Sequence, residues 1–469
     1  MVTLPWKIRG RGSLRLLIFI FMLALSVSAQ ECNKENPCAT GCCNILGLCG
    51  FGPDYCGNDC VADCDRKAYC DPDFGAEWAS ASSCPLNACC SKLGFCGTTD
   101  EFCGDEKVKR PSCPATNDLK RVRIPLGFYT HVIIAFATIS PETFEIQPTV
   151  KADIDIYRRV AFLKTMDPGL KVYIGVGGWT LNNPGRRATT FSDLAASASN
   201  QKTFLKSLIR FLSTYNLDGI DLSWEYPVVD DRGGRPEDFR NFPKLLRNLK
   251  AALQATGGRD GLSITLPTSY RHLQHFDIKS MVKHVDFFNF KSYDFHGTWD
   301  KGNEWEGGFL NAHINLTEIT DVLDLLWRNN ISPQQVVLGL PFYARSFTIA
   351  DPACTQPGCL FASGAEAGEC SREVGILKSP EISNIINEKS LTPTLYKKEG
   401  VKVVHCDDQW IKTDFARGQC LGGVMVWAIS HDTLSGKFST DLASVVRRKF
   451  QCFPVNMEED DGYTVKNEL

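Results

Sequence analysis

The distribution of cysteine constrains this chain more than any other feature of its sequence. Fifteen of the 21 cysteines lie between Cys32 and Cys113, and only six are spread over the rest of the 469 residues. Small units within such a segment cannot bury a sufficient apolar core, so covalent cross-links must hold them. Disulfides are typical of secreted chains with this cysteine density, and a structural zinc site is the competing interpretation. The odd total leaves one thiol without a partner, or with a partner missing from the sequence.

The first 29 residues have the three parts of a secretory signal peptide. A basic start contains Lys7, Arg9, Arg11 and Arg15, an apolar run spans 16–25, and small residues at 27–29 suit cleavage. The apolar run is too short for a membrane span, although a signal anchor is the alternative, and no later stretch is apolar for long enough. We therefore predict a secreted, extracellular protein whose mature chain has no membrane span. The net charge of −3 gives no sign of a nucleic-acid partner.

One cysteine spacing occurs twice. Cys42-Cys43 are followed after five residues by Cys49 and after six more by Cys56, and Cys89-Cys90, Cys96 and Cys103 repeat this spacing. All eight are expected to form disulfides, and Cys60, Cys64 and Cys70, which lie between the copies, are expected to tie them together. The spacing resembles that of the hevein-type chitin-binding module, which would place one module at 30–64 and a second at 65–104.

The resemblance implies that a hydroxyl and up to three aromatic side chains of each module bind N-acetylglucosamine. Ser91, Phe95 and Phe102 occupy these positions in the second copy, and Tyr55 is the one aromatic among them in the first. A flat ring suits the apolar face of a sugar, and a hydroxyl suits an acetamide oxygen. The second module is therefore expected to bind better, and the first is either a weaker binder or mainly structural.

After a polar linker at 105–120, the texture changes to apolar strand-like runs that alternate with helical patterns. Strands are predicted at 131–136, 171–176, 218–224, 262–266, 286–292, 336–340 and 423–428. An amphipathic helix is indicated by Phe242, Leu245, Leu246, Leu249 and Leu253, at spacings of three and four. This alternation predicts an α/β protein with a parallel sheet, either a barrel or doubly wound, and no glycine-rich nucleotide fingerprint favours the second option.

The strand at 218–224 carries acids on an otherwise apolar background. Because side chains alternate along a strand, Asp221, Ser223 and Glu225 share one face, with Asp218 just before them. Acidic side chains are costly to bury, so acids at such positions usually have a chemical task. The alternative is an exposed edge strand.

The run Asp218-Gly-Ile-Asp221-Leu-Ser223-Trp-Glu225-Tyr-Pro227 resembles the DGxDxDxE signature of family-18 glycoside hydrolases, the chitinases. The resemblance implies that Glu225 is the proton donor. It places Ser223 where the family has the acid that orients the substrate's acetamide, with Asp221 behind it. Asp218 opens the signature, and Tyr293 is expected to hold the acetamide carbonyl.

Further matches imply a (β/α)8 TIM barrel over about 121–452 with a small α+β insertion at about 344–421. They are Gly177-Gly178-Trp179, Tyr293-Asp294, Tyr343 with Arg345, and Trp427, all near predicted strand ends, where barrel enzymes keep their sites. Trp427 is expected under the cleaved sugar, and Trp179, Asp294, Tyr343 and Arg345 are expected to contact substrate. Trp179 and Trp427 have core packing as their alternative role.

Two departures from the family surround the same cleft. Lys291 stands where the family has Met, two residues before Tyr293 and so on the same face of its strand. An ammonium reaching the cleft would favour ionised Glu225, which opposes its task as an acid, whereas the alternative is that Lys291 extends to solvent. Gly175 stands where Ser is usual.

The strand count falls one short of a closed barrel, which needs eight. The family's first strand is apparently missing, because Val122 joins almost directly to Arg123. A skipped coding segment and true degeneration are the two explanations.

Three functions are compatible with this sequence. The first is a secreted chitinase that hydrolyses β-1,4-N-acetylglucosamine polymers by substrate assistance, with impaired activity and no cofactor or metal. The second is a catalytically weak chitin-binding lectin, and the third resembles the chitin-binding subunit of killer toxins, with an unknown toxin-type partner chain. An acidic tail at 453–469 is expected to be solvated.

Overall fold

The computed structural model describes residues 32–104, 108, 129–303, 306–403, 421–432 and 438–442. The expected signal peptide, the linker at 105–120 apart from Val108, and the acidic tail lie outside these residues. Across the described part, no helix is long and apolar enough to cross a membrane. The chain divides into two compact units, 1–83 with 90–96 and 84–89 with 97–469.

The cysteine-rich part contains short strands and single-turn helices. The first copy has β1 (Cys42–Asn44), β2 (Cys49–Gly50), α1 (Pro53–Cys56) and β3 (Cys60–Ala62), and the second has η1 (Pro85–Asn87), β4 (Cys89–Cys90), β5 (Cys96–Gly97) and α2 (Asp100–Cys103). In the first copy β1 pairs antiparallel with both β2 and β3. The repeated cysteine spacing therefore encodes a repeated order of strand, strand and helical turn.

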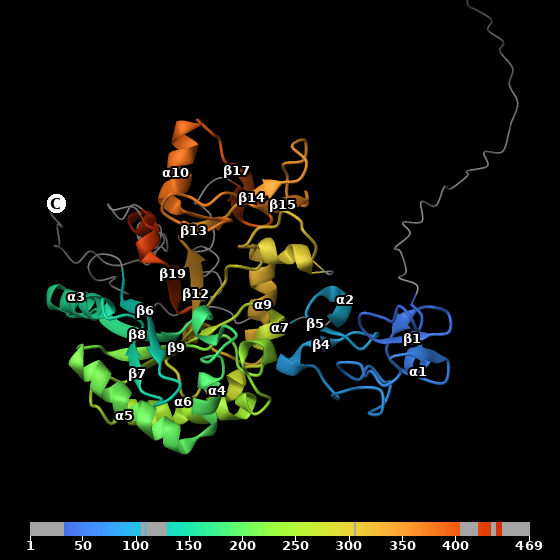
Figure 1. The fold of residues 1–469 in the computed structure, drawn as a ribbon, viewed down its shortest axis with the longest axis horizontal. Coiled ribbons are helices and arrows are strands. Elements are labelled where there is room, and N and C mark those ends of the chain that lie inside the picture. Colours follow the sequence, from blue (N-terminus) through green and yellow to red (C-terminus); the bar gives the residue numbers. More distant parts are fainter. Residues whose placement is uncertain are drawn as a thin grey trace, which may run out of the picture. The chain divides into compact units, whose positions relative to one another are not determined.

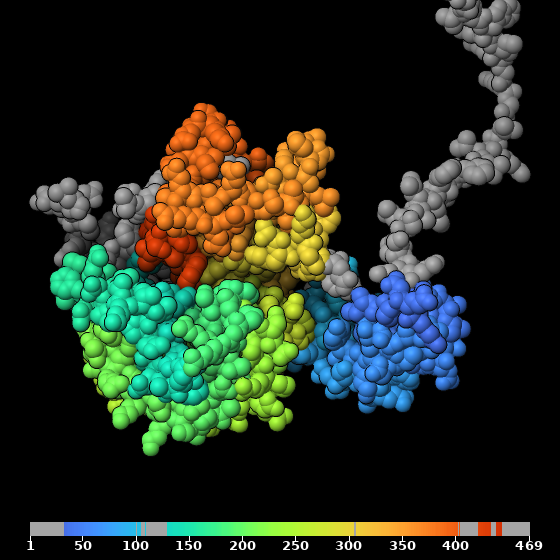
Figure 2. Space-filling view, viewed as in Figure 1, coloured from blue at the N-terminus to red at the C-terminus, as the bar shows by residue number. Residues whose placement is uncertain are grey.

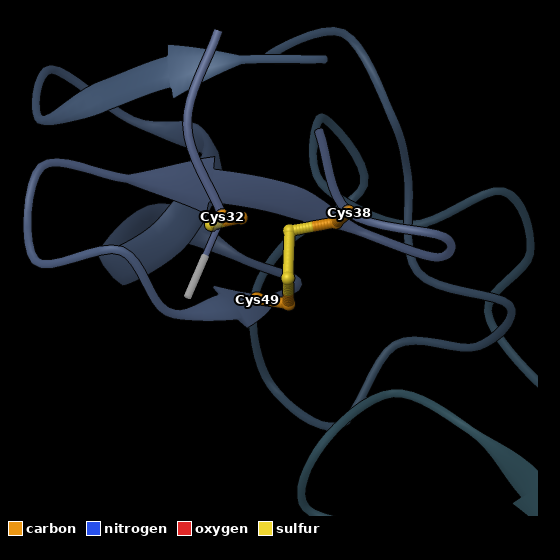
Figure 3. A group of neighbouring side chains, drawn as sticks. All are labelled: Cys32, Cys38 and Cys49. Carbon is orange, nitrogen blue, oxygen red and sulfur yellow. A yellow bond between two sulfur atoms is a disulfide. The ribbon is translucent and has the colours of Figure 1, made fainter. Parts of the chain in front are cut away.

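All eight cysteines of the repeated spacing are in disulfides, as predicted. The equivalent bonds Cys42–Cys56 and Cys89–Cys103 each join residues 14 apart. The other bonds are Cys32–Cys43, Cys38–Cys49 and Cys70–Cys90, and Cys96 is also disulfide-bonded. Figure 3 shows Cys38 bonded to Cys49 beside Cys32, so these neighbouring sulfurs belong to disulfides rather than to a zinc site.

The expectation that cysteines between the copies tie them together is wrong. Cys60 bonds to Cys64, four residues along the chain, and Cys70 bonds within the second copy. An apolar cluster makes the connection instead: Phe51 of the first copy lies edge-to-face with Phe95 of the second at 5.2 Å between ring centroids. The packing of Phe51 against Phe95 thus joins the two copies where a disulfide was expected.

Within the described residues of the larger unit, seven parallel strands form the main sheet, and they coincide with the seven predicted strands. They are β6 (His131–Ile139), β8 (Lys171–Gly177), β9 (Gly219–Ser223), β10 (Gly261–Leu266), β11 (Phe287–Phe290), β12 (Val336–Pro341) and β19 (Gly423–Trp427). The order is β19-β12-β11-β10-β9-β8-β6, and β7 (Ile146–Pro148) continues it antiparallel to β6. Figure 1 shows the crossover helices on the outer side of these strands, as parallel connections require.

The longer helices of this unit are α3 (Asp153–Met166), α4 (Thr190–Ala196), α5 (Ala198–Thr214), α6 (Asp238–Gln254) and α9 (Leu316–Arg328). Short turns of helix are η3 (Trp179–Asn182), η4 (Asp230–Arg232), α7 (Tyr270–Leu273), α8 (Ile278–Met281), η5 (Thr298–Gly302), η6 (Pro333–Gln335) and η7 (Ile429–His431). The five apolar residues that predicted a helix, Phe242, Leu245, Leu246, Leu249 and Leu253, are all buried on α6. The helical spacing in the sequence therefore marks the face that packs on the sheet.

Closure of the barrel is incomplete among the described residues, which contain no strand between β6 and β19. The predicted loss of the family's first strand concerns residues 109–128, which precede β6 and lie outside the described part. The two edge strands still approach each other at their C-terminal ends, because the rings of Phe136 and Trp427 stack with centroids 5.6 Å apart.

A small α+β insertion follows β12. Its described elements are β13 (Tyr343–Arg345), β14 (Phe347–Ile349), β15 (Phe361–Gly364), β16 (Ile376–Lys378), α10 (Ser379–Glu388), β17 (Thr394–Tyr396) and β18 (Val401–Val403). The strands pair antiparallel as β13–β16, β14–β15 and β17–β18. In Figure 2 it forms the orange surface that rises beside the green surface of the barrel. Of the described cysteines, Cys370 in this insertion is unpaired and exposed.

Candidate functional site

Glu225 lies just beyond the C-terminal end of β9, and both of its carboxylate oxygens are engaged. Oε2 accepts a hydrogen bond from Nζ of Lys291 at 2.9 Å, and Oε1 accepts one from Oγ of Ser223 at 3.2 Å. The Glu225 side chain is 5% exposed and that of Lys291 is 23% exposed. Lys291 therefore turns toward Glu225, and the alternative of extension to solvent is not what the structure shows.

The Lys291–Glu225 contact is an ion pair in a largely dry place. Burial by itself lowers the pKa of Lys291, but the neighbouring Glu225 carboxylate outweighs burial and raises that pKa above its ordinary value. Lys291 is therefore a permanent ammonium at working pH, and it holds the carboxylate that the family resemblance makes the acid.

Asp221 lies within β9, four residues before Glu225, and is almost completely buried. Its oxygens accept hydrogen bonds from Oγ of Ser263 at 2.7 Å, Oγ1 of Thr265 at 2.9 Å and Nδ2 of Asn289 at 2.9 Å. Burial raises the pKa of Asp221, and these three donors oppose that rise. Neighbouring strands β10 and β11 supply all three donors, so the sheet itself fixes this carboxyl group.

Asp218 is not brought to this cluster. It precedes β9, at the opposite end of the strand from Ser223, where its carboxylate accepts hydrogen bonds from Nζ of Lys164 at 3.0 Å and from the Val172 backbone N–H at 2.8 Å. These contacts join α3 and β8 to the start of β9. Asp218 therefore makes contacts that hold α3 and β8 to the start of β9, and it does not contact Glu225 or Asp221.

A second group of polar residues forms around Asp294, directly after β11. Its Oδ1 lies 2.9 Å from both Nε and Nη2 of Arg345, and 3.4 Å from Nδ1 of His313. Burial alone raises the pKa of Asp294, but the hydrogen bond and charge of His313, together with the Arg345 guanidinium, hold that pKa below its ordinary value. Asp294 thus stays ionised and anchors the first strand of the insertion to the barrel.

Tyr293 connects the two groups. Its ring lies edge-to-face with Tyr343 at 6.2 Å, and its hydroxyl is influenced by the charges of Lys291, Asp294 and Glu225. Burial raises the pKa of Tyr293 well above its ordinary value. The hydroxyl is therefore protonated throughout the physiological range and can donate a hydrogen bond to a carbonyl oxygen.

Arg232, which the sequence analysis did not identify, contacts both Trp179 and Glu225. Its guanidinium lies 3.8 Å from the centre of the Trp179 ring, and Nε donates to the backbone carbonyl of Glu225 at 3.0 Å. Trp179 is 55% exposed and so presents a free aromatic face. The position of Arg232 in the sequence, seven residues after Glu225, gives little indication of these contacts. They form because η4 folds back and brings Arg232 next to Trp179 and Glu225.

Phe136 is a second residue that sequence reasoning missed. It stacks on Trp427, and a β-carbon at Gly178 would lie 2.7 Å from its ring, at Gly175 3.1 Å. The ring of Phe136 therefore occupies the space beside both glycines, which gives a steric reason for glycine at position 175. Its place at the end of a predicted strand was the signal that could have identified it.

The two cysteine-rich copies present their predicted sugar-binding residues in similar local settings. Tyr55 and Phe102 each pack so closely on a glycine that a β-carbon at Gly50 or Gly97 would lie within 2.6 Å of the ring. In the second copy, the Ser91 hydroxyl accepts a hydrogen bond from the Phe95 backbone N–H at 3.2 Å.

Phe95 is less available than the sequence suggested. It is half-buried, and its ring contacts Phe51 and Tyr69 as part of the apolar cluster between the copies. Phe102 and Tyr55 are likewise half-buried, but neither belongs to that cluster.

A parallel barrel sheet with a near-buried glutamic acid, a tyrosine hydroxyl and aromatic side chains at its strand ends defines a class, the barrel-type glycoside hydrolases and their non-hydrolytic relatives. This chain belongs to glycosyl hydrolases family 18, whose model matches residues 106–432. A second model, that of chitin recognition proteins, matches residues 73–113, which include most of the second cysteine-rich copy. The protein is thus a member of the chitinase family with a chitin-recognition domain.

Several curated proteins are similar to this chain. Putative chitinase 1 of Margaritifera margaritifera is 29% identical over 68% of this chain and 69% of its own length. Secreted chitinase LysM12 of Penicillium expansum and killer toxin subunits alpha/beta of Kluyveromyces lactis are each 30% identical over 76% of this chain, which spans only 23% and 29% of their lengths.

Solved structures agree on the fold. Catalytic domain 2 of the Group II chitinase of Ostrinia furnacalis is 26% identical, with a TM-score of 0.60 over 68% of this chain and 89% of that one. Human YKL-39, described as a pseudo-chitinase with retained chitooligosaccharide binding, is 24% identical, with a TM-score of 0.58 over 69% of this chain and 91% of that one. This similarity is one of fold.

Proposed function

We propose that this chain is a secreted chitin-binding chitinase of impaired turnover, which hydrolyses β-1,4-linked N-acetylglucosamine polymers with the help of the substrate's own acetamide. The observation that carries the chitinase is the buried Glu225 side chain at the end of β9, and its ion pair with Lys291 at 2.9 Å carries the impairment. Membership of family 18 and the chitin-recognition match support the substrate class. The disulfides and the similarity to a secreted Penicillium chitinase support secretion.

In the proposed reaction, the acetamide oxygen attacks the anomeric carbon while the bond to the leaving sugar oxygen breaks. Glu225 gives its proton to that leaving oxygen, and the sugar becomes a cyclic oxazolinium ion, which water then opens as Glu225 recovers the proton. The Tyr293 hydroxyl is placed to donate a hydrogen bond to the acetamide carbonyl. Trp427 and Phe136 offer apolar surface for the sugar, and Trp179 offers an exposed face at the rim.

Two features slow this reaction. Ser223 supplies a hydroxyl where a carboxylate would offset the positive charge of the oxazolinium ion, and loss of one such stabiliser typically costs about 10²–10³ in rate. Lys291 also engages the carboxylate that must carry the proton. Ser223 acts on the stability of the transition state and Lys291 acts on the acid before the reaction begins, while the aromatic surfaces proposed to bind sugar are unaffected.

The second candidate is a chitin-binding lectin without turnover, which the Lys291–Glu225 ion pair favours directly. A chitin-anchoring toxin subunit is the third, and its support is the similarity to the Kluyveromyces killer toxin subunits.

Binding to chitin beads and hydrolysis of a chitin hexamer by the parent and by Glu225→Gln separate the first two. The chitinase predicts retained binding in both proteins, with slow hydrolysis in the parent and none in Glu225→Gln. Binding without turnover in either protein would establish the lectin. A parent kcat in the ordinary enzyme range of about 1–10³ s⁻¹ would contradict the impairment.

A further inference from the structure

The segment that follows Asp294 holds a group of titratable side chains that the cleft chemistry does not use. Nδ1 of His296 lies 3.1 Å from Oδ2 of Asp300, and Nε2 lies 2.9 Å from Oε1 of Glu318. Glu306 completes the group: one ligand atom each of His296, Asp300 and Glu306 lies within 4.8 Å of the others. One imidazole therefore faces three carboxylates contributed by η5, the turn after it, and α9.

Two carboxylate oxygens in this group are unsatisfied. The Asp300 side chain is 1% exposed. Its Oδ1, and Oε2 of Glu318, are buried and have no hydrogen-bond partner within the described part of the chain. A buried carboxylate oxygen without a donor costs about 1–3 kcal/mol or more, so native proteins rarely leave one. A metal ion beside Asp300 would remove that cost for its Oδ1.

We propose that His296, Asp300 and Glu306 bind a divalent transition-metal ion of the Mn²⁺ or Zn²⁺ type, while Glu318 accepts the hydrogen bond of the other imidazole nitrogen. One imidazole nitrogen with several carboxylate oxygens suits these ions, whereas Ca²⁺ takes oxygen ligands alone. The site is open to solvent on one side, because Glu306 is exposed and the Glu318 side chain is 33% exposed. An ion therefore has a path of entry to the buried Asp300.

An ion at this site would stabilise the segment that follows β11 and contains η5. Glu318 is in the first turn of α9, whereas Asp300 is in η5. Between Asp294 and Asp300 lies Trp299, whose ring is 4.7 Å from the guanidinium of Arg345. A bound ion would connect α9 to the segment that carries these residues, and the melting temperature should rise with ion concentration.

The test is titration of the purified, chelator-treated full chain with MnCl2, followed by the electron paramagnetic resonance signal of free Mn²⁺ and by the melting temperature. The expected result is saturable binding of one ion per chain. Glu306→Gln and Glu318→Gln should each weaken binding by about tenfold or more. Because Glu306 is exposed, its variant should have the parent's melting temperature in the absence of metal.

Glu145→Gln is the matched control. Glu145 is an exposed carboxylate on the same unit whose one described ion pair, with Arg210, is long at 3.5 Å. This substitution removes the same charge and should leave Mn²⁺ binding unchanged. Absence of saturable binding in the parent, or equal binding by the parent and both site variants, would overturn the proposal. Displacement of Mn²⁺ by equimolar Ca²⁺ would overturn the assignment to a transition metal.

Discussion

Replacement of Lys291 by methionine should raise the rate of chitin hydrolysis, because it releases the Glu225 side chain from its ion pair. The two charged atoms are 2.9 Å apart, and the Glu225 side chain is 5% exposed. At an effective dielectric constant of about 20, unit charges at this distance attract by about 5–6 kcal/mol. Lys291 is 23% exposed, so water screens part of this attraction, and about 2–3 kcal/mol is the expected strength of the pair. Its removal should raise kcat by about 30- to 160-fold.

The second half of this prediction concerns Ser223→Asp. The new carboxylate should restore charge stabilisation worth about 10²–10³ in rate. It would also lie close to Glu225, because the Ser223 hydroxyl is 3.2 Å from Oε1, and Lys291 would then pair with both acids. We therefore expect the double variant to exceed the product of the two single effects, since residues in one network are not additive.

The assay is release of a fluorophore from a chitobiose or chitotriose conjugate at pH 5 and pH 7, with melting temperatures measured in parallel. Glu225→Gln in each background is the control and should abolish the gain. A kcat of Lys291→Met within twofold of the parent, at an unchanged melting temperature, would refute the argument that the ion pair limits turnover. Retention of the gain after Glu225→Gln would refute the role of Glu225 as the acid.

Three further predictions test the surroundings of the site. Asp218→Asn should lower the free energy of unfolding in urea by about 2–4 kcal/mol, because it breaks the ion pair with Lys164. The kcat per folded molecule should not change, and a lower kcat of fully folded protein would contradict this prediction. Burial lowers the pKa of His272 to about 4. The contribution of His272 to stability should therefore be constant above pH 6.5 and fall by up to about 3 kcal/mol as the pH drops from 6.5 to 4, where the unfolded chain takes up a proton that the folded chain does not. Urea unfolding over this pH range with and without His272→Asn measures the difference, and an equal pH dependence of the two proteins would disprove it. Phe102→Ala should weaken binding to chitin beads by about tenfold and Tyr55→Ala by less, whereas equal losses would show that both modules bind alike.

Local sequence patterns determined much of the architecture. Apolar runs bounded by polar segments gave seven strands whose observed bounds differ by at most a few residues, because side-chain alternation and strand length are properties of short segments. The cysteine spacing likewise identified the disulfide-bonded residues, since both copies are too small to fold otherwise. The pairing of Cys60 with Cys64 was not foreseen, because any two nearby cysteines can bond and the choice depends on the turn between them.

The candidate site was determined by the sequence only in part. A spacing of two residues placed Ser223 and Glu225 on the same face, as side-chain alternation in an extended segment requires. Whether Lys291 turns toward Glu225 or toward water was left open, since a long flexible side chain chooses its direction from three-dimensional surroundings.

The tertiary structure alone decided the contacts that join distant segments. Arg232 reaches Glu225 and Trp179 through η4, and His296 meets Glu318 across 22 residues. Hydrogen bonds and ion pairs of this kind act over a few ångströms, and no sequence spacing encodes which distant segments a fold brings to that distance. The sequence therefore determined most of the strands and helices and pointed to Glu225 as the candidate acid, and the packing of the barrel decided which charges surround Glu225.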